Sequence, residues 1–125
     1  MKHKTITLCG QEVGIGYCAA TETGYETMSG QSISVFYPQG DEPPKATTED
    51  YIRLAIAGII AYYARWGGEA PIDIKNIIYD AAPADITAML TAIVELRNAW
   101  YQVPAVVSPE PVNPDEAEKE EPEKN

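Results

Sequence analysis

Hydrophobic residues recur with helical spacing over residues 48–66, and this is the most regular pattern in the chain. Its members follow one another at spacings of four, three, four and three residues: Ile52, Ile56, Ile59, Tyr63 and Trp66. Residues at these spacings share one face of a helix. Leu54, Ala55 and Ile60 add apolar surface on other sides. We therefore expect this helix to be buried on most sides and to be central to the fold.

Alternation of apolar and polar residues predicts two strands near the N-terminus, over residues 2–8 and 12–17. The segment Cys9-Gly10-Gln11 between them favours a turn, so we expect an antiparallel hairpin. With the turn centred on the last two residues of that segment, the numbers of cross-strand partners sum to 21. This register pairs His3 with Cys18.

Three further helices are expected, over residues 19–29, 73–82 and 84–101. The first ends before Gly30, and its inward face is expected to carry Ala20, Met28 and either Gly24 or Tyr25. Residues 31–37 alternate, which is compatible with a third short strand, and the pattern leaves open whether Ile33 to Phe36 is strand or helix. The predicted fold class is α+β and mainly α, with the hairpin packed on a bundle of about four helices.

Negative charge is concentrated toward the C-terminus of the 125-residue chain. The formal net charge is −10, and residues 104–125 contribute −5 of it through seven acids and two lysines. This segment also contains five prolines and few apolar residues, so we expect a disordered acidic tail after a single folded domain over residues 1–103. The folded part has no cluster of Lys and Arg, which argues against binding to nucleic acid.

The sequence predicts neither a membrane span nor a secretion signal. The uncharged core of the helix at 48–66 runs for eleven residues, from Leu54 to Ala64, whereas a bilayer requires roughly 20. The alternating residues at the N-terminus lack the apolar core of a signal peptide. We therefore expect a cytoplasmic protein.

Cofactor and metal sites are not expected. The soft metal ligands are His3, Cys9 and Cys18, and the expected register brings together two of them where zinc takes four. Gly14-Ile15-Gly16 is similar to the beginning of a dinucleotide-binding loop, but Ala19 occupies the third glycine position. The two glycines are expected to permit a bend or a bulge in the second strand.

Catalytic residues are not expected either. The carboxylate pairs Glu22 with Glu26 and Asp41 with Glu42 lie on an exposed face and in a proline-rich loop, where no carboxyl is held protonated. His3 is the only histidine, so no nucleophile has a base beside it. We expect that the protein is not an enzyme.

Aromatic residues are the unusual component, with eight tyrosines and two tryptophans. Half-buried Tyr and Trp commonly anchor protein interfaces, because they bury much area with little loss of entropy. The alternative is a core whose tyrosine hydroxyls reach the surface. Seven residues are candidates for partner binding: Tyr25, Tyr37, Tyr51, Tyr62, Trp66, Tyr79 and Tyr101.

The segment KTITLCGQEVGIGYCAATETGYETMSGQSI resembles the N-terminal half of phage tail assembly chaperones. In that family the opening commonly runs as strand, glycine turn, strand and a helix that ends in Thr-Gly or Ser-Gly. Here Tyr25-Glu26 lies in the expected helix and Ser29-Gly30 closes it. The helices expected over 48–66 and 84–101 are similar to the later half, so the likeness covers about residues 4–101.

The resemblance implies a small cytoplasmic protein, made during infection or from a prophage and absent from the mature virion. It would bind the tape measure protein and keep it soluble while the tail tube polymerises. The tail tube protein is a second candidate partner, and weak self-association is compatible with this role. The family often has a longer form made by ribosomal frameshifting, and residues 106–125 lie where such an extension would join.

A hypothesis from a different class is an acidic phage or mobile-element protein that inhibits a host nuclease by mimicking nucleic acid. Such a mimic requires carboxylates arrayed on the folded surface. In this sequence the strongest acidity lies in the predicted tail.

Overall fold

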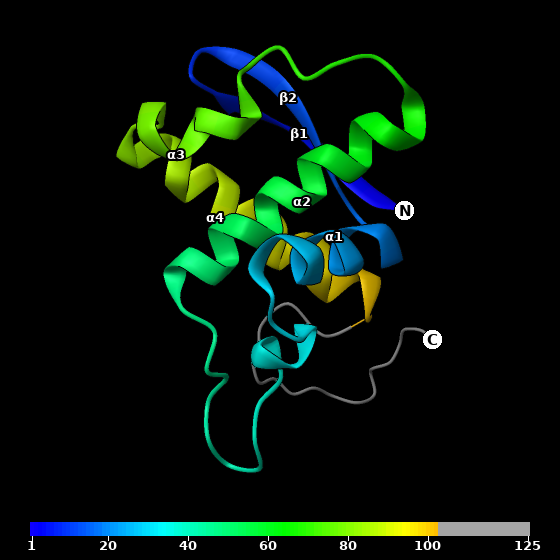
Figure 1. Ribbon diagram of the computed structural model, residues 1–125, viewed down its shortest axis with the longest axis vertical. Coiled ribbons are helices and arrows are strands. Elements are labelled where there is room, and N and C mark those ends of the chain that lie inside the picture. Colours follow the sequence, from blue (N-terminus) through cyan, green and yellow to red (C-terminus); the bar gives the residue numbers. More distant parts are fainter. Residues whose placement is uncertain (103–125) are drawn as a thin grey trace, which may run out of the picture.

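The computed structural model describes residues 1–102, which form an N-terminal β-hairpin on a mainly helical body, as the sequence predicts (Figure 1). Strands β1 (Lys2–Leu8) and β2 (Gln11–Tyr17) lead into helix α1 (Ala19–Ser29). The two long helices are α2 (Thr48–Trp66) and α4 (Pro83–Trp100). Three short helical segments complete the order: η1 (Ile33–Phe36) before α2, and η2 (Ile74–Asn76) and α3 (Ile77–Asp80) before α4. The predicted tail, residues 104–125, lies outside the described residues.

Helix α2 crosses the middle of the molecule and contacts α1, β2 and α4 (Figure 1). Ile52 and Ile59 of the predicted stripe are buried, but Trp66 is 47% exposed. Burial instead spreads around the helix to residues off that stripe: Leu54, Ala55, Ala57, Gly58 and Ala61. The expectation that α2 is central and buried on most sides is confirmed.

Strand β2 lies against α2 along one edge, and glycines make this approach possible. A Cβ atom at Gly58 of α2 would lie 2.6 Å from the carbonyl oxygen of Gly16. A Cβ atom at Gly14 would lie 2.2 Å from the ring of Tyr62. The strand pairs with β1 along its length without a bulge. The glycines therefore serve close packing, and the bend or bulge that we expected at Gly14 and Gly16 is wrong.

The hairpin has a two-residue loop, Cys9–Gly10, and a register in which partner numbers sum to 19. Both loop residues have positive φ, 51° at Cys9 and 78° at Gly10, as the twist of a two-residue hairpin loop requires. The predicted sum of 21 is wrong, and His3 lies opposite Gly16 instead of Cys18. A shift of two residues keeps every side chain on its predicted face.

A 3₁₀ helix, η1, takes the place of the third strand that the alternation allowed. The hydroxyl of Ser32 accepts a hydrogen bond from the Ser34 amide at 3.1 Å, and the carboxylate of Glu26 accepts one from the Ile33 amide at 2.8 Å. These bonds cap the short helix, and Phe36 turns into the core. The edge of β2 to which a third strand would add is already covered by α2.

Helix α1 buries Thr21 and Tyr25, whereas Ala20 and Met28 of the expected inward face are exposed. Polar contacts set this orientation. The Thr21 hydroxyl donates to the carbonyl of Gly16 at 3.0 Å, and the Tyr25 hydroxyl reaches a carboxylate on α2. The expected burial of Tyr25 is confirmed, whereas that of Ala20 and Met28 is wrong.

The last helices agree with the sequence in position but not fully in length. The helix expected over 73–82 is reduced to η2 and the single turn of α3, which buries Ile77 and leaves Ile78 exposed. Helix α4 buries the centre of its predicted stripe: Met89, Ile93 and Leu96.

Ile59→Ala is expected to lower the free energy of unfolding by about 2 to 5 kcal/mol, because Ile59 is fully buried in the hydrophobic core. The matched control is Ile60→Ala on the same helix, whose side chain is 51% exposed. It should cost about 0.5 kcal/mol or less. Urea unfolding of both variants measures the difference, and equal costs would contradict the placement of α2.

Candidate partner-binding surface

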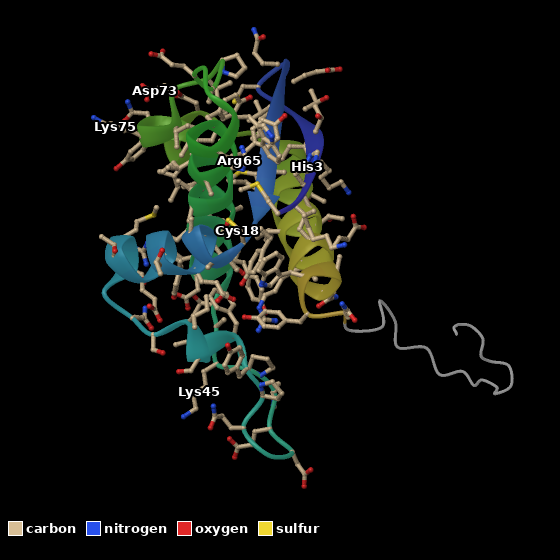
Figure 2. All side chains as sticks on the ribbon, turned by 90° about the vertical axis from the view of Figure 1, so that its right-hand side faces the viewer. His3, Cys18, Lys45, Arg65, Asp73 and Lys75 are labelled. Atoms are coloured by element: carbon tan, nitrogen blue, oxygen red, sulfur yellow. The ribbon has the colours of Figure 1, made fainter. Side chains whose placement is uncertain are left out.

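An apolar groove of about 290 Å³ lies between α1, α2 and η2. It is lined by Met28, Ile56, Ile60, Ile74 and Lys75. The side chains of Met28 and Ile60 are 41% and 51% exposed, so two large apolar side chains face solvent here. Figure 2 shows Lys75 on the side of α2 away from the hairpin residue His3.

The far wall of the groove is positioned by Asp73. Its carboxylate accepts hydrogen bonds from the Lys75 amide at 3.2 Å and from the Asn76 side chain at 2.7 Å. These bonds start η2 and direct Ile74 toward the groove. The Lys75 ammonium has no ion pair among the described residues.

A second exposed cluster surrounds Arg97 near the end of α4. The guanidinium carbon lies 5.9, 5.4 and 5.2 Å from the ring centroids of Phe36, Tyr37 and Tyr101, respectively. Tyr37 and Tyr101 are 37% and 41% exposed. Trp100, which is 36% exposed, joins them through Tyr17, whose ring centroid lies 6.5 Å from that of Trp100 and 6.4 Å from that of Tyr101. Arg, Tyr and Trp are the residue types that most often dominate binding energy at protein interfaces.

Glu22 of α1 connects two tyrosines at this cluster through hydrogen bonds. Its carboxylate accepts hydrogen bonds from the hydroxyl of Tyr17, at 2.7 Å, and from the hydroxyl of Tyr101. Burial and then the Glu22 hydrogen bond raise the pKa of Tyr17, and the same causes raise the pKa of Tyr101. Both phenols therefore remain protonated donors, which suits a structural anchor.

A third aromatic cluster joins β1 to the end of α2. The ring centroid of Trp66 lies 4.7 Å from that of His3 and 5.0 Å from that of Tyr62. The guanidinium of Arg65 lies 5.4 Å from the Trp66 ring.

The seven aromatic candidates do not form one patch. Tyr25 is fully buried, so it does not reach the surface and its inclusion is corrected. Tyr51 and Tyr62 are half-buried. The remaining four are exposed, and they lie in different places: Tyr37, Trp66, Tyr79 and Tyr101. The structure groups Tyr37 with Tyr101 on Arg97, whereas Tyr79, at 81%, is the most exposed of the large hydrophobic residues that the structure describes.

Sequence reasoning missed the aliphatic residues of the groove. Ile60 was assigned to the buried surface of the central helix and Met28 to the inward face of α1. Helical spacing gave no signal, because Met28 follows the buried Tyr25 by three residues and Ile60 follows Ile56 by four. Recognising the groove also required knowing that Ile74 lies beside them.

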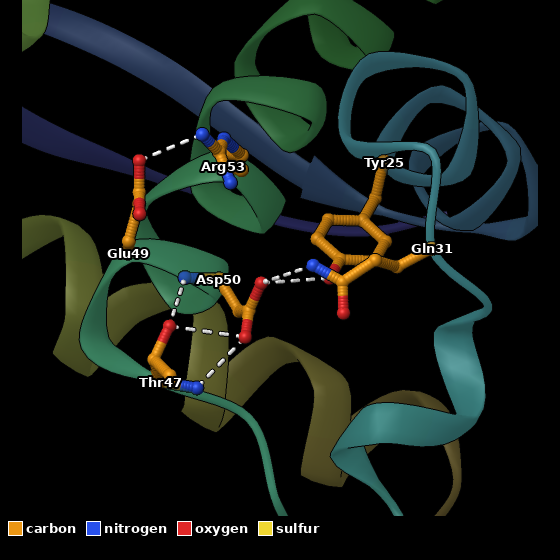
Figure 3. Close-up of polar contacts among 6 residues, drawn as sticks. All are labelled: Tyr25, Gln31, Thr47, Glu49, Asp50 and Arg53. Carbon is orange, nitrogen blue, oxygen red and sulfur yellow. Dashed lines mark hydrogen bonds and ion pairs between the residues drawn. The ribbon is translucent and has the colours of Figure 1, made fainter.

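The buried carboxylate of Asp50 has a structural role (Figure 3). It accepts hydrogen bonds from the hydroxyl of Tyr25 at 3.0 Å, from the side-chain amide of Gln31 at 3.4 Å, and from the amide and hydroxyl of Thr47 at 2.8 and 3.0 Å. Burial raises the pKa of Asp50, but these hydrogen bonds outweigh burial and hold the pKa below its ordinary value. The network joins α1 and the segment before α2 to the first turn of α2.

The described residues offer little chemistry. Within residues 1–102, no three His, Cys, Asp or Glu side chains lie close enough to hold a metal ion. The pKa of the Cys9 thiol is raised, first by partial burial and then by the charge of Asp85, so this thiol is not activated. None of the helices in this part of the chain combines the length and apolar character needed to cross a membrane.

Comparisons with protein families, curated proteins and solved structures found no match to this chain. Function is therefore inferred from the surface of the protein and from the resemblance carried by its sequence.

Asp50→Asn is expected to lower stability at neutral pH and to remove part of the acid sensitivity of the fold. Because the folded pKa of Asp50 is depressed, its contribution is present above the unfolded value of about 3.9 and is lost as pH falls through the folded value. The difference in unfolding free energy between the wild type and the variant should therefore shrink in acid. Urea unfolding across this range measures it.

Asp41→Asn is the control for the loss of a carboxylate, because Asp41 lies exposed in the loop before α2, and it should cost about 0.5 kcal/mol or less. Identical acid dependence in the wild type and Asp50→Asn would contradict the role of the network.

Proposed function

We propose that this protein is a phage tail assembly chaperone that binds the tape measure protein and keeps it soluble while the tail tube polymerises. The observation that carries the proposal is the apolar groove between α1, α2 and η2. It is supported by the resemblance of residues 4–101 to this family.

The groove suits the apolar face of an amphipathic helix. Grooves of this kind take side chains at positions i, i+3 or i+4 and i+7 of a partner helix, and tape measure proteins are long and helical. Four of the five lining residues are aliphatic, so no convergent set of polar groups is present to orient a small substrate. Lys75 at the groove can pair with an acidic residue on the polar side of the partner helix.

The exposed cluster around Arg97 provides a second anchor, for the same partner or for the tail tube protein. Its exposed members are the residues that carry aromatic area: Tyr37, Trp100 and Tyr101. The net charge of −10 then keeps the complex soluble and supplies little of its affinity.

Nucleic-acid mimicry is less well supported, because many carboxylates of the folded part are already engaged. Residues 1–102 contain twelve acids. Seven accept hydrogen bonds or form ion pairs within the structure: Glu22, Glu26, Glu49, Asp50, Asp73, Asp85 and Glu95. The remaining five are spread over the hairpin, the loops and α3: Glu12, Asp41, Glu42, Glu69 and Asp80.

Ile60→Asp is expected to weaken binding to the tape measure protein of the same phage or prophage by at least about tenfold, because it places a charge in the groove. Val94→Asp is the matched control, since Val94 is 39% exposed on α4 and does not line the groove. Titration calorimetry on the coexpressed and separated partners measures both affinities.

The affinity of the wild type should change little between about 50 and 200 mM salt, whereas a nucleic-acid mimic would lose much of its binding. Failure to form a complex on coexpression, or equal weakening by both substitutions, would contradict the proposal. Gene order is an independent check: a tail tube gene before this one, a slippery heptamer near its end and a long helical reading frame after it.

A further inference from the structure

The outer edge of β1 carries backbone hydrogen-bonding groups that have no partner among the described residues. On β2, the Gly14 amide donates to a tyrosine hydroxyl on α2, and the Gly16 carbonyl accepts from a threonine hydroxyl on α1. Both glycines therefore point these groups away from β1. In an antiparallel pair, when one residue points its amide and carbonyl away from the neighbouring strand, the residue opposite it also points its amide and carbonyl away. Thr5 and His3, which lie opposite Gly14 and Gly16, thus turn their amides and carbonyls outward.

This edge is accessible along the strand. By alternation, the backbone amide and carbonyl of Thr7 point outward like those of His3 and Thr5. All three residues are exposed. Helix α2 covers the edge of β2. Helix α4 packs along β1, and an ion pair between Lys4 and Glu95 at 2.6 Å places it on the face to which the even-numbered side chains of β1 point. A strand edge with free amides and carbonyls is a template for another strand.

We infer that the outer edge of β1 pairs with the same edge of a second copy of this protein. The two hairpins then form one four-stranded antiparallel sheet, with a two-fold axis at Thr5. In this register Thr5 lies opposite Thr5 of the partner copy, and His3 lies opposite Thr7 of the partner copy. The outward amides and carbonyls of His3, Thr5 and Thr7 then all face those of the partner copy, which gives about six backbone hydrogen bonds between the copies.

Charge on the strand selects this register. Lys2 and Lys4 lie opposite the partner copy's Leu8 and Ile6, so no like charges face each other. A slip of two residues in one direction would place Lys4 directly opposite Lys4, which is destabilising. A slip in the other direction would place Ile6 opposite Ile6 and leave only Thr5 and Thr7 to pair, which gives about four bonds in place of six. The edge is therefore most complementary to itself in the register centred on Thr5, and this favours a second copy over an unrelated strand. The central Thr–Thr pair adds to the stability of the sheet.

The dimer is expected to be weak and to leave the groove open. A contact along one strand buries less than the roughly 1,200 Å² of stable interfaces, so it forms at high protein concentration. Lys75 of the groove lies on the side of α2 away from His3 (Figure 2). The pairing does not depend on the proposed function, and both copies would keep their grooves accessible.

Thr5→Pro tests the pairing, because proline removes the outward amide at the centre of the edge. The bonds between β1 and β2 do not use that amide. Sedimentation equilibrium of the full chain from about 10 µM to 1 mM should show a monomer–dimer equilibrium for the wild type and at least about tenfold weaker association for Thr5→Pro. Thr5→Val is the matched control, since it keeps the amide and the β-branched shape, and it should associate like the wild type.

A charge pair gives a second readout that does not require proline in a strand. Thr5→Lys and Thr5→Glu each place like charges across the two-fold axis, so each alone should be monomeric, and a mixture of the two should form a heterodimer. The exposed position of Thr5 makes both variants compatible with the folded monomer. A wild type that stays monomeric across the range, or charge variants that associate as strongly as the wild type, would overturn the inference.

Discussion

The close contact between α2 and β2 is the constraint on which the rest of the structure depends. At Gly58 and Gly16 a helix and a strand edge approach so closely that neither a side chain nor a third strand fits between them. Because α2 occupies this edge, the sheet stops at two strands and its free edge is that of β1. Helix α1 follows β2 directly and packs against α2, and its Thr21 hydroxyl bonds the same Gly16 carbonyl. The groove between α1, α2 and η2 is a consequence of that placement.

The elements of the fold follow from local pattern, whereas their pairing depends on distant contacts. Helical spacing and glycine stops were enough to place α1, α2 and α4 within about one residue. The loop of the hairpin was misplaced because Cys9 adopts a left-handed conformation that non-glycine residues rarely take. The carboxylate of Asp85, 76 residues away, accepts a hydrogen bond from the Cys9 amide at 3.1 Å and stabilises the loop. No local pattern reveals that bond.

The sequence predicted the type of residue found at the candidate surface, but not which of these residues lie there. The excess of tyrosine and tryptophan correctly suggested exposed aromatic side chains, because such residues rarely all fit in a small core. It could not separate Tyr37 and Tyr101, which gather on Arg97, from Tyr25, which is buried by its bond to Asp50. The groove was not predictable from periodicity, because its walls come from three segments that are far apart in the sequence.

The most direct test of that contact compares two helical glycines. Alanine favours a helix over glycine by about 1 kcal/mol, so Gly24→Ala should be neutral or stabilising, since its Cβ would lie 3.5 Å from Ala57 in ordinary contact. Gly58→Ala should instead destabilise the fold by about 1 to 3 kcal/mol despite the same gain in propensity, because its Cβ would meet the Gly16 carbonyl at 2.6 Å. Urea unfolding of both variants decides the matter. A Gly58→Ala protein as stable as Gly24→Ala would contradict the account.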